Sequence, residues 1–372
     1  MSKVKLGDVA IESRETYKGD KSGLPIVGLE HITPEEVTLS NWATDTENTF
    51  TKMFRKGDIL FGRRRAYLKK AAQAPFDGIC SGDITVIRAK ADKLLPDLLP
   101  FIIQNDDLFD FAVGKSAGSL SPRVKWENLK NYAFELPSLD EQKKLAEVLW
   151  SINDTIQAYQ NLLAETDELV KSQFIEMFKD KFPVILLGDE INTTSGGTPS
   201  RKKDEYYIGG DIPWLTSGEV NLGFIDSTQN FITQKGLDNS SAKWVPENSV
   251  VIAMYGATAG KVGVIKIPVT TNQAVCTLLP NPEFNTLFLY YACKANEEWM
   301  LSKCAGAAQP NISQTIIKEM PIPKPPIDKQ ERFAAFVEQS DKSKFALQSA
   351  ITSLQATKRS IIDEAFGIRR KE

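Results

Sequence analysis

Histidine and cysteine are scarce in this sequence of 372 residues, which contains one histidine, His31, and four cysteines. A metal site with two histidine ligands is therefore excluded, and the cysteines lack the CxxC or Cys–His spacing of a zinc site. They also form no recognisable disulfide framework, which is typical of a protein from the reducing cytoplasm. The sequence predicts a cytoplasmic protein without a bound metal.

Long hydrophobic runs and an excess of positive charge are missing as well. No apolar run approaches the ~18–20 residues that a membrane-spanning helix needs, and the residues after Met1 resemble the start of a folded domain rather than a signal peptide. The 45 Lys and Arg residues against 48 Asp and Glu residues give a net charge of −3. A free-standing DNA-binding protein is usually basic, so binding to nucleic acid would require basic residues gathered on one face.

Motifs for catalysis or cofactor binding are not found. The segment Gly256–Lys261 resembles a phosphate-binding loop, but three residues separate its glycines where a Walker A loop has four, and Val262 replaces the magnesium-binding hydroxyl. The segment Asn281–Phe284 resembles the Asn-Pro-Pro-aromatic motif of amino-methyltransferases, but Glu283 replaces its second proline and no glycine-rich cofactor loop accompanies it. We therefore predict no active site and no cofactor.

The sequence does contain a long stretch with the hydrophobic spacing of a coiled coil. Its seam positions are separated alternately by four and three residues, which is the a/d pattern. We place the N-cap at Asp140, just after Pro137, and expect about 35–40 residues of helix, a rod of roughly 55–60 Å. The seam positions are Leu145, Leu149, Ile152, Ile156, Tyr159, Leu163, Thr166, Val170, Gln173 and Met177.

The same stretch returns in the second half of the chain. Pro325–Gln330 matches Pro137–Gln142, and the register continues without a gap to Phe366, which matches Phe178. A period of nearly half the chain is too long for a solenoid repeat, so it predicts a duplicated domain followed by a helix. Further upstream, the match is found again at Leu6-Gly7-Asp8 and Leu187-Gly188-Asp189.

The second copy carries polar residues at three seam positions, Ser340, Lys344 and Lys358. Polar residues at such positions weaken a coiled coil but fix its register and partner. Each long helix has a single apolar stripe that must be buried. The nearest partner is the other copy, so we expect the two helices to pair.

The remaining sequence is typical of compact mixed domains. Trp214 is expected in a core, and a helical pattern covers Leu94–Phe111. Strand-like runs lie between turn signals at Asp58–Phe61, Ile84–Ile87, Ser249–Tyr255 and Val262–Ile267.

Basic residues gather in two stretches of the first half. Between Lys52 and Lys70 there are eight Lys or Arg residues against one Asp. Arginine supplies a planar fork for guanine and phosphate oxygens, lysine a point charge and tyrosine a stacking face, although such a charge run is also found as a solvated surface. The candidate DNA contacts here are Arg63, Arg64, Arg65, Tyr67, Lys69, Lys115, Ser119, Arg123 and Lys125.

The second half offers a different set of loop residues. A glycine- and hydroxyl-rich loop with a basic end follows Thr194 and could bring backbone N–H groups close to phosphates, but Gly-Gly-Thr-Pro is also an ordinary turn. The amides Asn272 and Gln273 could read adenine, although amides are more often turn caps. The candidate DNA contacts of this half are Ser195, Gly197, Thr198, Ser200, Arg201, Lys202, Tyr255, Thr258, Lys261, Asn272, Gln273, Gln309 and Asn311.

Taken in order, these motifs resemble the DNA-specificity (S) subunit of type I restriction–modification systems over essentially the whole chain. The first half departs from the pattern, because it has no Gly-Gly-Thr-Pro and carries Arg63–Tyr67 where the second half has its glycine loop. The motifs that carry the resemblance are Pro137–Gln142 and Pro325–Gln330, Gly196-Gly-Thr-Pro-Ser200, Ile212-Pro-Trp-Leu215, Gly256-Ala-Thr-Ala-Gly-Lys261 with Asn272-Gln273, and Ala307-Ala-Gln-Pro-Asn-Ile312.

The resemblance implies an α+β fold with two globular target-recognition domains in an internal duplication, separated by two long antiparallel coiled-coil helices. It implies a non-catalytic subunit in which each domain reads one half of a bipartite double-stranded DNA site, while the helices set the spacing. The expected parts are residues 1–138 for the first domain, 139–180 for the first helix, 181–326 for the second domain and 327–368 for the second helix.

The resemblance also implies partners. These are two methyltransferase subunits, which would dock on the helices, and restriction or translocase subunits where the system has them. We expect Gln142 and Gln330, at the two helix starts, to be exposed docking residues. The alternative interpretation is a two-headed coiled-coil adaptor between proteins, which the slightly acidic composition favours and which predicts no salt-dependent affinity for DNA.

Overall fold

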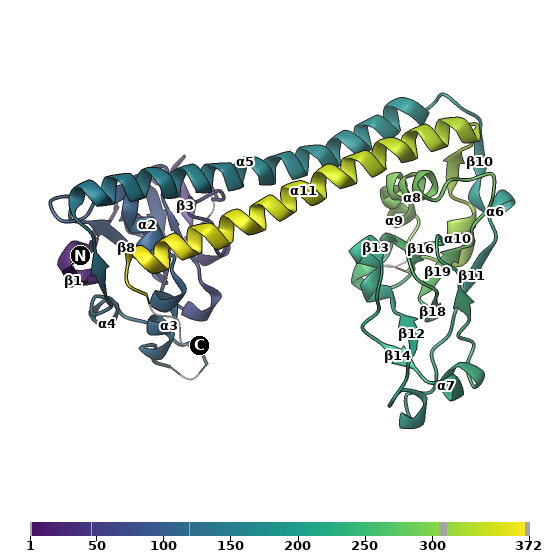
Figure 1. The fold of residues 1–372 in the computed structure, drawn as a ribbon, viewed down its shortest axis with the longest axis horizontal. Helices are drawn as coiled ribbons and strands as arrows, with labels where there is room; N and C mark the ends of the chain where they lie inside the picture. Colours follow the sequence, from purple (N-terminus) through teal and green to yellow (C-terminus); the bar gives the residue numbers. More distant parts are fainter. Residues whose placement is uncertain (1, 46, 119, 305–310, 369–372) are drawn as a thin grey trace. The chain divides into compact units, whose positions relative to one another are not determined.

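The computed structural model describes residues 2–45, 47–118, 120–304 and 311–368. The chain forms two compact units, one made of Met1–Asn161 with Leu347–Glu372 and the other of Leu162–Ala346. Each unit contains one globular domain and a part of each of two long helices, α5 (Leu139–Phe178) and α11 (Ile327–Ala365) (Figure 1). The fold is therefore a mixed α+β arrangement in two copies, as expected.

The first unit contains a four-stranded antiparallel sheet in the order β2–β8–β5–β6 and a three-stranded sheet in the order β3–β7–β4. The strand-like runs expected at Asp58–Phe61 and Ile84–Ile87 are β5 and β8. The elements are β1 (Ser2–Lys5), α1 (Leu6–Val9), β2 (Ala10–Glu12), β3 (Ile26–Val27), η1 (Leu29–His31), β4 (Lys52–Phe54), β5 (Ile59–Gly62), η2 (Ala66–Leu68), β6 (Ala71–Gln73), β7 (Gly78–Cys80), β8 (Ile84–Ala89), η3 (Pro96–Leu98), α2 (Leu99–Ile103), α3 (Asp106–Gly114), α4 (Trp126–Leu129) and β9 (Ala133–Leu136).

The helical pattern expected around Leu94–Phe111 is divided in the structure. Asn105 separates α2 from α3, because its side-chain oxygen accepts a hydrogen bond from Leu108 N at 2.7 Å and so caps α3. All residues of α2 are buried. The Phe109 ring of α3 stacks on Phe61 of β5 with centroids 5.5 Å apart, so these helices cover the larger sheet.

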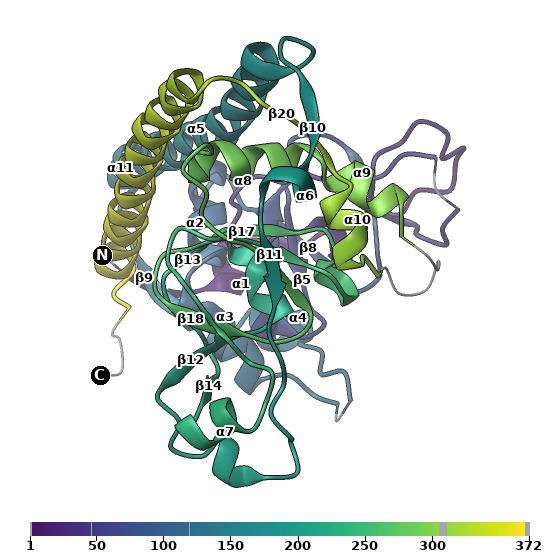
Figure 2. The ribbon, with the colours of Figure 1, turned by 90° about the vertical axis from the view of Figure 1, so that its right-hand side faces the viewer.

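The second unit contains a five-stranded sheet in the order β11–β19–β16–β17–β13 and a four-stranded sheet in the order β14–β12–β18–β15. The runs expected at Ser249–Tyr255 and Val262–Ile267 are β16 and β17. Trp214 is 3% exposed, which confirms its expected place in a core. Helix α8 lies beside the long helices and α7 at the opposite end of this unit (Figures 1 and 2).

The elements of the second unit outside the long helices are β10 (Val184–Leu186), α6 (Leu187–Glu190), β11 (Thr193–Ser195), η4 (Asp204–Tyr206), β12 (Ile212–Leu215), η5 (Ser217–Leu222), β13 (Phe224–Ile225), β14 (Phe231–Ile232), α7 (Gln234–Asp238), β15 (Trp244–Val245), β16 (Val250–Ala253), η6 (Gly256–Thr258), β17 (Val262–Ile265), β18 (Val269–Thr271), β19 (Val275–Leu278), α8 (Thr286–Ala295), α9 (Glu297–Ser302), α10 (Gln314–Lys318) and β20 (Pro321–Pro323). Strand β20, which directly precedes α11, pairs antiparallel with β10 at the start of its domain. In the same way β9, which directly precedes α5, pairs antiparallel with β1. The duplication is thus visible in the strand pairing.

Helix α5 buries the stripe that the sequence predicts. Every seam position from Leu145 to Met177 is buried or half-buried. The expected N-cap at Asp140 is wrong, because α5 already begins at Leu139. Instead, the Ser138 amide and hydroxyl both donate to the Glu141 carboxylate at 2.9 Å, a capping box that starts the helix two residues earlier.

The two long helices run antiparallel in each unit. In the first unit, Leu149 of α5 shares a core cluster with Ile362 of α11. In the second, Phe174 of α5 shares a core cluster with Phe333 of α11. The start of α5 thus packs with the end of α11, and the end of α5 with the start of α11. Among the described residues, no helix has both the length and the apolar character needed to cross a membrane.

Candidate nucleic-acid interface

The fold brings the two basic stretches of the first unit together. Arg64 and Arg123 form an antiparallel bridge, Arg65 N donates to Pro122 O at 2.8 Å, and Val124 N donates to Arg63 O at 3.0 Å. We call the segments 63–70 and 115–125 the first loop pair. Residues almost sixty positions apart in the sequence therefore form one surface, which no local pattern could indicate.

A carboxylate from a third segment joins this loop pair. The Arg123 guanidinium donates to Asp83 through Nε at 2.7 Å and Nη2 at 3.3 Å. Arg64 donates to Asp83 through Nη1 at 3.4 Å and to the Ser121 hydroxyl through Nε at 2.6 Å. The hydrogen bond from Arg123 lowers the pKa of Asp83, so its carboxylate stays charged at neutral pH. The sequence analysis did not single out Asp83.

The other candidates of the first loop pair have different surroundings. Arg65 and Tyr67 are exposed, and Arg65 has a left-handed backbone with φ of 52°. Lys115 and Lys125 are also exposed. Arg63 is half-buried, and its Nε is buried without a hydrogen-bond partner among the described residues, so this nitrogen points away from solvent. Ser119 lies outside the described residues.

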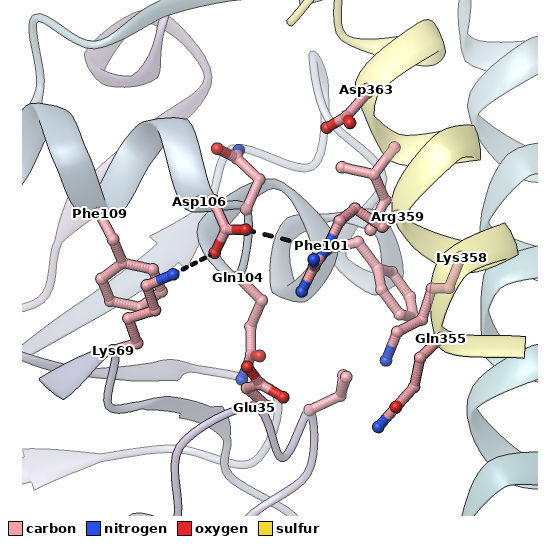
Figure 3. Close-up of a pocket in the computed structure, with 13 residues that line it drawn as sticks. Glu35, Lys69, Phe101, Gln104, Asp106, Phe109, Gln355, Lys358, Arg359 and Asp363 are labelled. Carbon is pink, nitrogen blue, oxygen red and sulfur yellow. Dashed lines mark hydrogen bonds and ion pairs between the residues drawn. The ribbon is translucent and has the colours of Figure 1, made fainter. Parts of the chain in front are cut away.

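Lys69 points into a cavity of about 110 Å³ against α11 (Figure 3). Its ammonium lies 2.5 Å from Asp106, and the same carboxylate lies 3.8 Å from the Arg359 guanidinium. Lys358 also lines the cavity, and burial lowers the pKa of its ammonium. The cavity is lined by both carboxylates and cations, so it has no clear preference for an anion, and Lys69 is engaged in an ion pair there.

The backbone hydrogen bonds of Gly62, Arg63 and Val124 form what we call the backbone frame of the first loop pair. The second unit repeats this frame. Met254 N donates to Ala274 O and Ile312 N to Met254 O, both at 2.8 Å, just as Arg63 N donates to Asp83 O and Val124 N to Arg63 O. The bridge between Arg64 and Arg123 has its counterpart between Tyr255 and Asn311. The hydrogen bond from Ala253 N to Lys261 O likewise matches the one from Gly62 N to Lys70 O. These bonds align Arg64 with Tyr255, Asp83 with Ala274 and Arg123 with Asn311.

The side chains on the second frame differ from those on the first. Tyr255 is 40% exposed and Asn311 is exposed. Lys261 is partly exposed and forms an ion pair with Glu297 at 3.0 Å, while the Thr258 hydroxyl donates to Ser217 O. Gln309, expected beside Asn311, lies outside the described residues.

The loop after Thr194 turns its glycines inward. A Cβ on Gly196 would lie 1.8 Å from the Thr271 carbonyl oxygen, and Gly197 is buried with its N–H donated to that oxygen at 3.0 Å. The Ser195 hydroxyl is also buried and has no partner among the described residues. Because these groups face the core, the expectation that Ser195 and Gly197 contact phosphate is wrong: the glycines allow close packing.

The outer part of this loop remains at the surface. Ser200, Arg201 and Lys202 are exposed, and the Thr198 hydroxyl donates to the side-chain oxygen of Gln273, which is itself exposed. The Asn272 side-chain oxygen accepts from Ala274 N at 3.0 Å. Asn272 therefore caps a turn, the alternative that its type also favoured.

Gln142 and Gln330 are not exposed docking residues, because they are 1% and 0% exposed. The Gln142 side chain accepts from Leu95 N at 2.9 Å and donates to Pro137 O at 3.0 Å. Gln330 accepts from Asn285 N at 2.9 Å and donates to Pro325 O at 2.9 Å. Each glutamine therefore fastens a long helix to its own domain, in the same way in both units.

Groups that could support catalysis are few in the part of the chain that the structure describes. No cluster of three or more His, Cys, Asp or Glu side chains there could hold a metal ion. Burial raises the pKa of the Cys80 and Cys276 thiols to about 12, so neither is a thiolate at neutral pH.

Comparison with known proteins identifies one family. The model of the type I restriction modification DNA specificity domain matches residues 1–166 and again residues 180–354. The specificity subunit of the type I restriction enzyme EcoR124I/EcoR124II from Escherichia coli is 28% identical over 160 residues, which are 42% of this chain and 40% of that protein. The MjaIX specificity subunit from Methanocaldococcus jannaschii is 30% identical over 158 residues, 41% of this chain and 36% of that protein. The matches thus span well under half the length of these two relatives.

Solved structures share the fold over nearly the whole chain. A chain from work on complex assembly and conformational transition of the type I R-M system superposes with a TM-score of 0.61 at 22% identity, covering 98% of this chain and 97% of that one. The S subunit of a type I restriction–modification system from M. genitalium gives a TM-score of 0.57 at 16% identity, with 99% and 96% covered. At these identities the likeness concerns the fold.

Proposed function

Because this chain belongs to the family of type I restriction–modification DNA specificity proteins, with its family model matched twice along the chain, we propose that it selects the DNA sequence in a type I restriction–modification complex. Each domain reads one half of a bipartite site in double-stranded DNA. The chain itself is non-catalytic and acts in the cytoplasm, and the transfer of methyl groups belongs to partner subunits.

The observation that carries this proposal is the repeated backbone frame with different side chains. Arg64 and Arg123 occupy the positions that Tyr255 and Asn311 occupy in the second unit. Arginine donates to guanine in the major groove and asparagine pairs with adenine. Two domains that share one backbone frame but carry different hydrogen-bonding side chains suit a DNA site whose halves differ in sequence. Exposed cations, such as Arg65 in the first loop pair and Arg201 in the loop after Thr194, would contact phosphates.

We further propose that the long helices set the spacing between the half-sites. Helix α5 has 40 residues and α11 has 39, which correspond to about 60 Å at ~1.5 Å per residue. Half-sites one helical turn apart are separated by ~34 Å along B-DNA. The helices are therefore long enough to act as a ruler.

Methyltransferase subunits would dock on the outer faces of these helices rather than at the buried glutamines. Leu162 and Leu169 lie seven residues apart on α5, on one face of the helix, and are 45% and 53% exposed. Leucines in such a position suit an apolar contact with a partner. Replacing both with arginine should weaken complex formation while DNA-contacting loops are untouched.

The experiment that tests the proposal is methylation mapping by long-read sequencing. DNA from cells that carry this chain and its methyltransferase subunit is compared with DNA from cells that lack only this chain. A methylated bipartite motif that disappears with the chain is the expected result. If no motif depends on the chain while the complex still forms, the proposal fails and the adaptor interpretation is favoured.

A further inference from the structure

Asp83 contacts Arg64 and Arg123 of the first loop pair, and the proposed function assigns it no role. It directly precedes β8 and lies between the two segments of the first loop pair, with its side chain 22% exposed. Its carboxylate accepts from Arg123 through both oxygens and from Arg64 through Oδ2. Two guanidinium groups brought this close would repel one another without the carboxylate, since like charges a few ångströms apart are unfavourable.

The hydrogen bonds to Asp83 and Ser121 use only part of each guanidinium. Arg123 uses Nε and Nη2 for Asp83, while Arg64 uses Nε for Ser121 and Nη1 for Asp83. Among the described residues no hydrogen bond uses Arg123 Nη1 or Arg64 Nη2, and the two side chains are 41% and 40% exposed. The planar fork is thus held in one orientation with donors to spare.

The space next to Asp83 is open. Asp83 lines a groove of about 620 Å³ together with Arg14, Lys52 and Ser81. Asp83 therefore borders open space as well as contacting the two arginines.

The second unit provides an internal comparison. Ala274 takes the place of Asp83 there, and the arginines are replaced by Tyr255 and Asn311. Neither tyrosine nor asparagine carries a charge that a carboxylate would need to balance. The carboxylate is present on the frame that carries the arginines and missing on the frame that lacks them, which ties its role to the arginines rather than to the frame.

We infer that Asp83 is a positioning residue for base reading, which orients Arg64 and Arg123 to donate to guanine O6 and N7 in the first half-site. The inference rests on the proposed function. A fixed guanidinium loses less conformational freedom when it forms two parallel hydrogen bonds, and it rejects a base that cannot accept both. Asp83 itself does not touch the DNA in this arrangement.

The test uses the complete complex of this chain with its methyltransferase subunit, and the methylated motif supplies the cognate duplex. For wild type and Asp83→Asn we would titrate the cognate duplex, a duplex with a G·C pair of the first half-site changed to A·T, and a duplex altered in the second half-site. The readout is the ratio of affinities, cognate over altered, because a ratio does not depend on how much of the protein is folded. Asp77→Asn is the matched control, since Asp77 forms an exposed ion pair with Arg55 outside the loop pair.

We expect Asp83→Asn to lower the first half-site ratio about tenfold, the size of one bidentate base contact, and to leave the second half-site ratio and the control variant unchanged. Asp83→Glu keeps a carboxylate and should retain more of the ratio than Asp83→Asn. Equal losses at both half-sites would assign Asp83 to general structure, and an unchanged ratio with a lower salt slope would assign the arginines to phosphates; either overturns the inference. A wild-type complex without any bipartite motif is a different outcome, which refutes the proposed function itself.

Discussion

In the first unit the loop frame carries Arg64 and Arg123 fastened to one carboxylate, whereas in the second the same backbone positions carry Tyr255 and Asn311 beside an alanine. Three main-chain hydrogen bonds of the first frame, those donated by Gly62, Arg63 and Val124, have counterparts in the second. Backbone geometry has thus been kept after duplication while the chemistry of the exposed side chains has diverged. A protein of this kind can change what it reads without changing how its loops fold.

The largest effect on the difference between the two units is expected when both arginines of the first frame are removed. Arg64→Ala with Arg123→Ala should weaken binding of the complex to its cognate duplex by about 100-fold or more, because each bidentate arginine contact contributes about 1–3 kcal/mol. Titrations with duplexes altered in one half-site check this. The ratio of affinities for the cognate duplex and a duplex altered in the second half-site should stay unchanged. If it fell to the same extent, the two frames would not act independently.

The equivalence of the two units can be tested at the buried glutamines. Gln142→Ala or Gln330→Ala should each lower the free energy of unfolding by about 2–3 kcal/mol, since each removes the side-chain partner of a half-buried backbone N–H and of a buried carbonyl oxygen. Denaturant unfolding followed by circular dichroism measures the loss. Gln157→Ala, an exposed position on α5, is the control and should change little. A neutral result at one of the buried glutamines would show that the two clamps are not equivalent.

The second frame can be weakened alone at Asn311. Asn311→Ala should relax discrimination in the second half-site by about 1–2 kcal/mol, because asparagine pairs with adenine through two hydrogen bonds. The measurement is the affinity ratio for duplexes altered in that half-site only. A uniform loss over all duplexes would mean that Asn311 positions the backbone instead of reading a base.

The seam lysines of α11 differ between the units. Lys344 is bound to Asp167 at 3.0 Å and Asp341 at 2.7 Å; burial lowers the pKa of its ammonium, but these hydrogen bonds outweigh burial and raise it. For Lys358 no such bond is found among the described residues, and burial lowers its pKa. We expect Lys344→Met to destabilise the protein by about 1 kcal/mol and Lys358→Met to stabilise it slightly.

Thermal or denaturant unfolding of both variants checks these opposite signs. The folded-state pKa of Lys358 lies below that of the unfolded chain, so its charged form costs stability at low and neutral pH. This cost is relieved as the pH rises through the folded-state pKa, and the advantage of Lys358→Met should shrink accordingly. The same sign of change in both variants would contradict the distinction.

The smallest effect is expected at Arg65. Arg65→Ala should weaken binding only a few-fold and equally for all sequences, and it should reduce the slope of log affinity against log salt by about one, as expected for one phosphate contact. Titrations at several salt concentrations measure this slope. A change in base preference instead would place Arg65 among the reading residues.

Much of this fold could be predicted because it follows from local spacing. The alternation of four and three residues between Leu145 and Met177 requires a helix with one buried stripe, and in the structure each of these positions is buried or half-buried. The repeated segments Pro137–Gln142 and Pro325–Gln330 mark where both helices begin, at Leu139 and Ile327. Residue types also indicated which loops carry cations at the surface.

Other features depend on which side of a loop or helix faces the core. The polar type of Gln142 suggested an exposed side chain, yet the domain packs over the helix start and offers it Leu95 N and Pro137 O. Ser195 and Gly197 belong to a loop that resembles a phosphate site but is folded against Thr271. In such cases the direction of a side chain is set by distant segments, so residue type alone points to the wrong surroundings.

The sequence by itself determined the duplication, the two long helices and the family to which the chain belongs, because periodicity and repeated motifs are local properties. Only the tertiary structure brought Asp83 between Arg64 and Arg123 and aligned them with Ala274, Tyr255 and Asn311. These residues come from three separate segments in each unit. Long-range strand pairing and loop hydrogen bonds, which have no signature in neighbouring residues, determine where those segments meet.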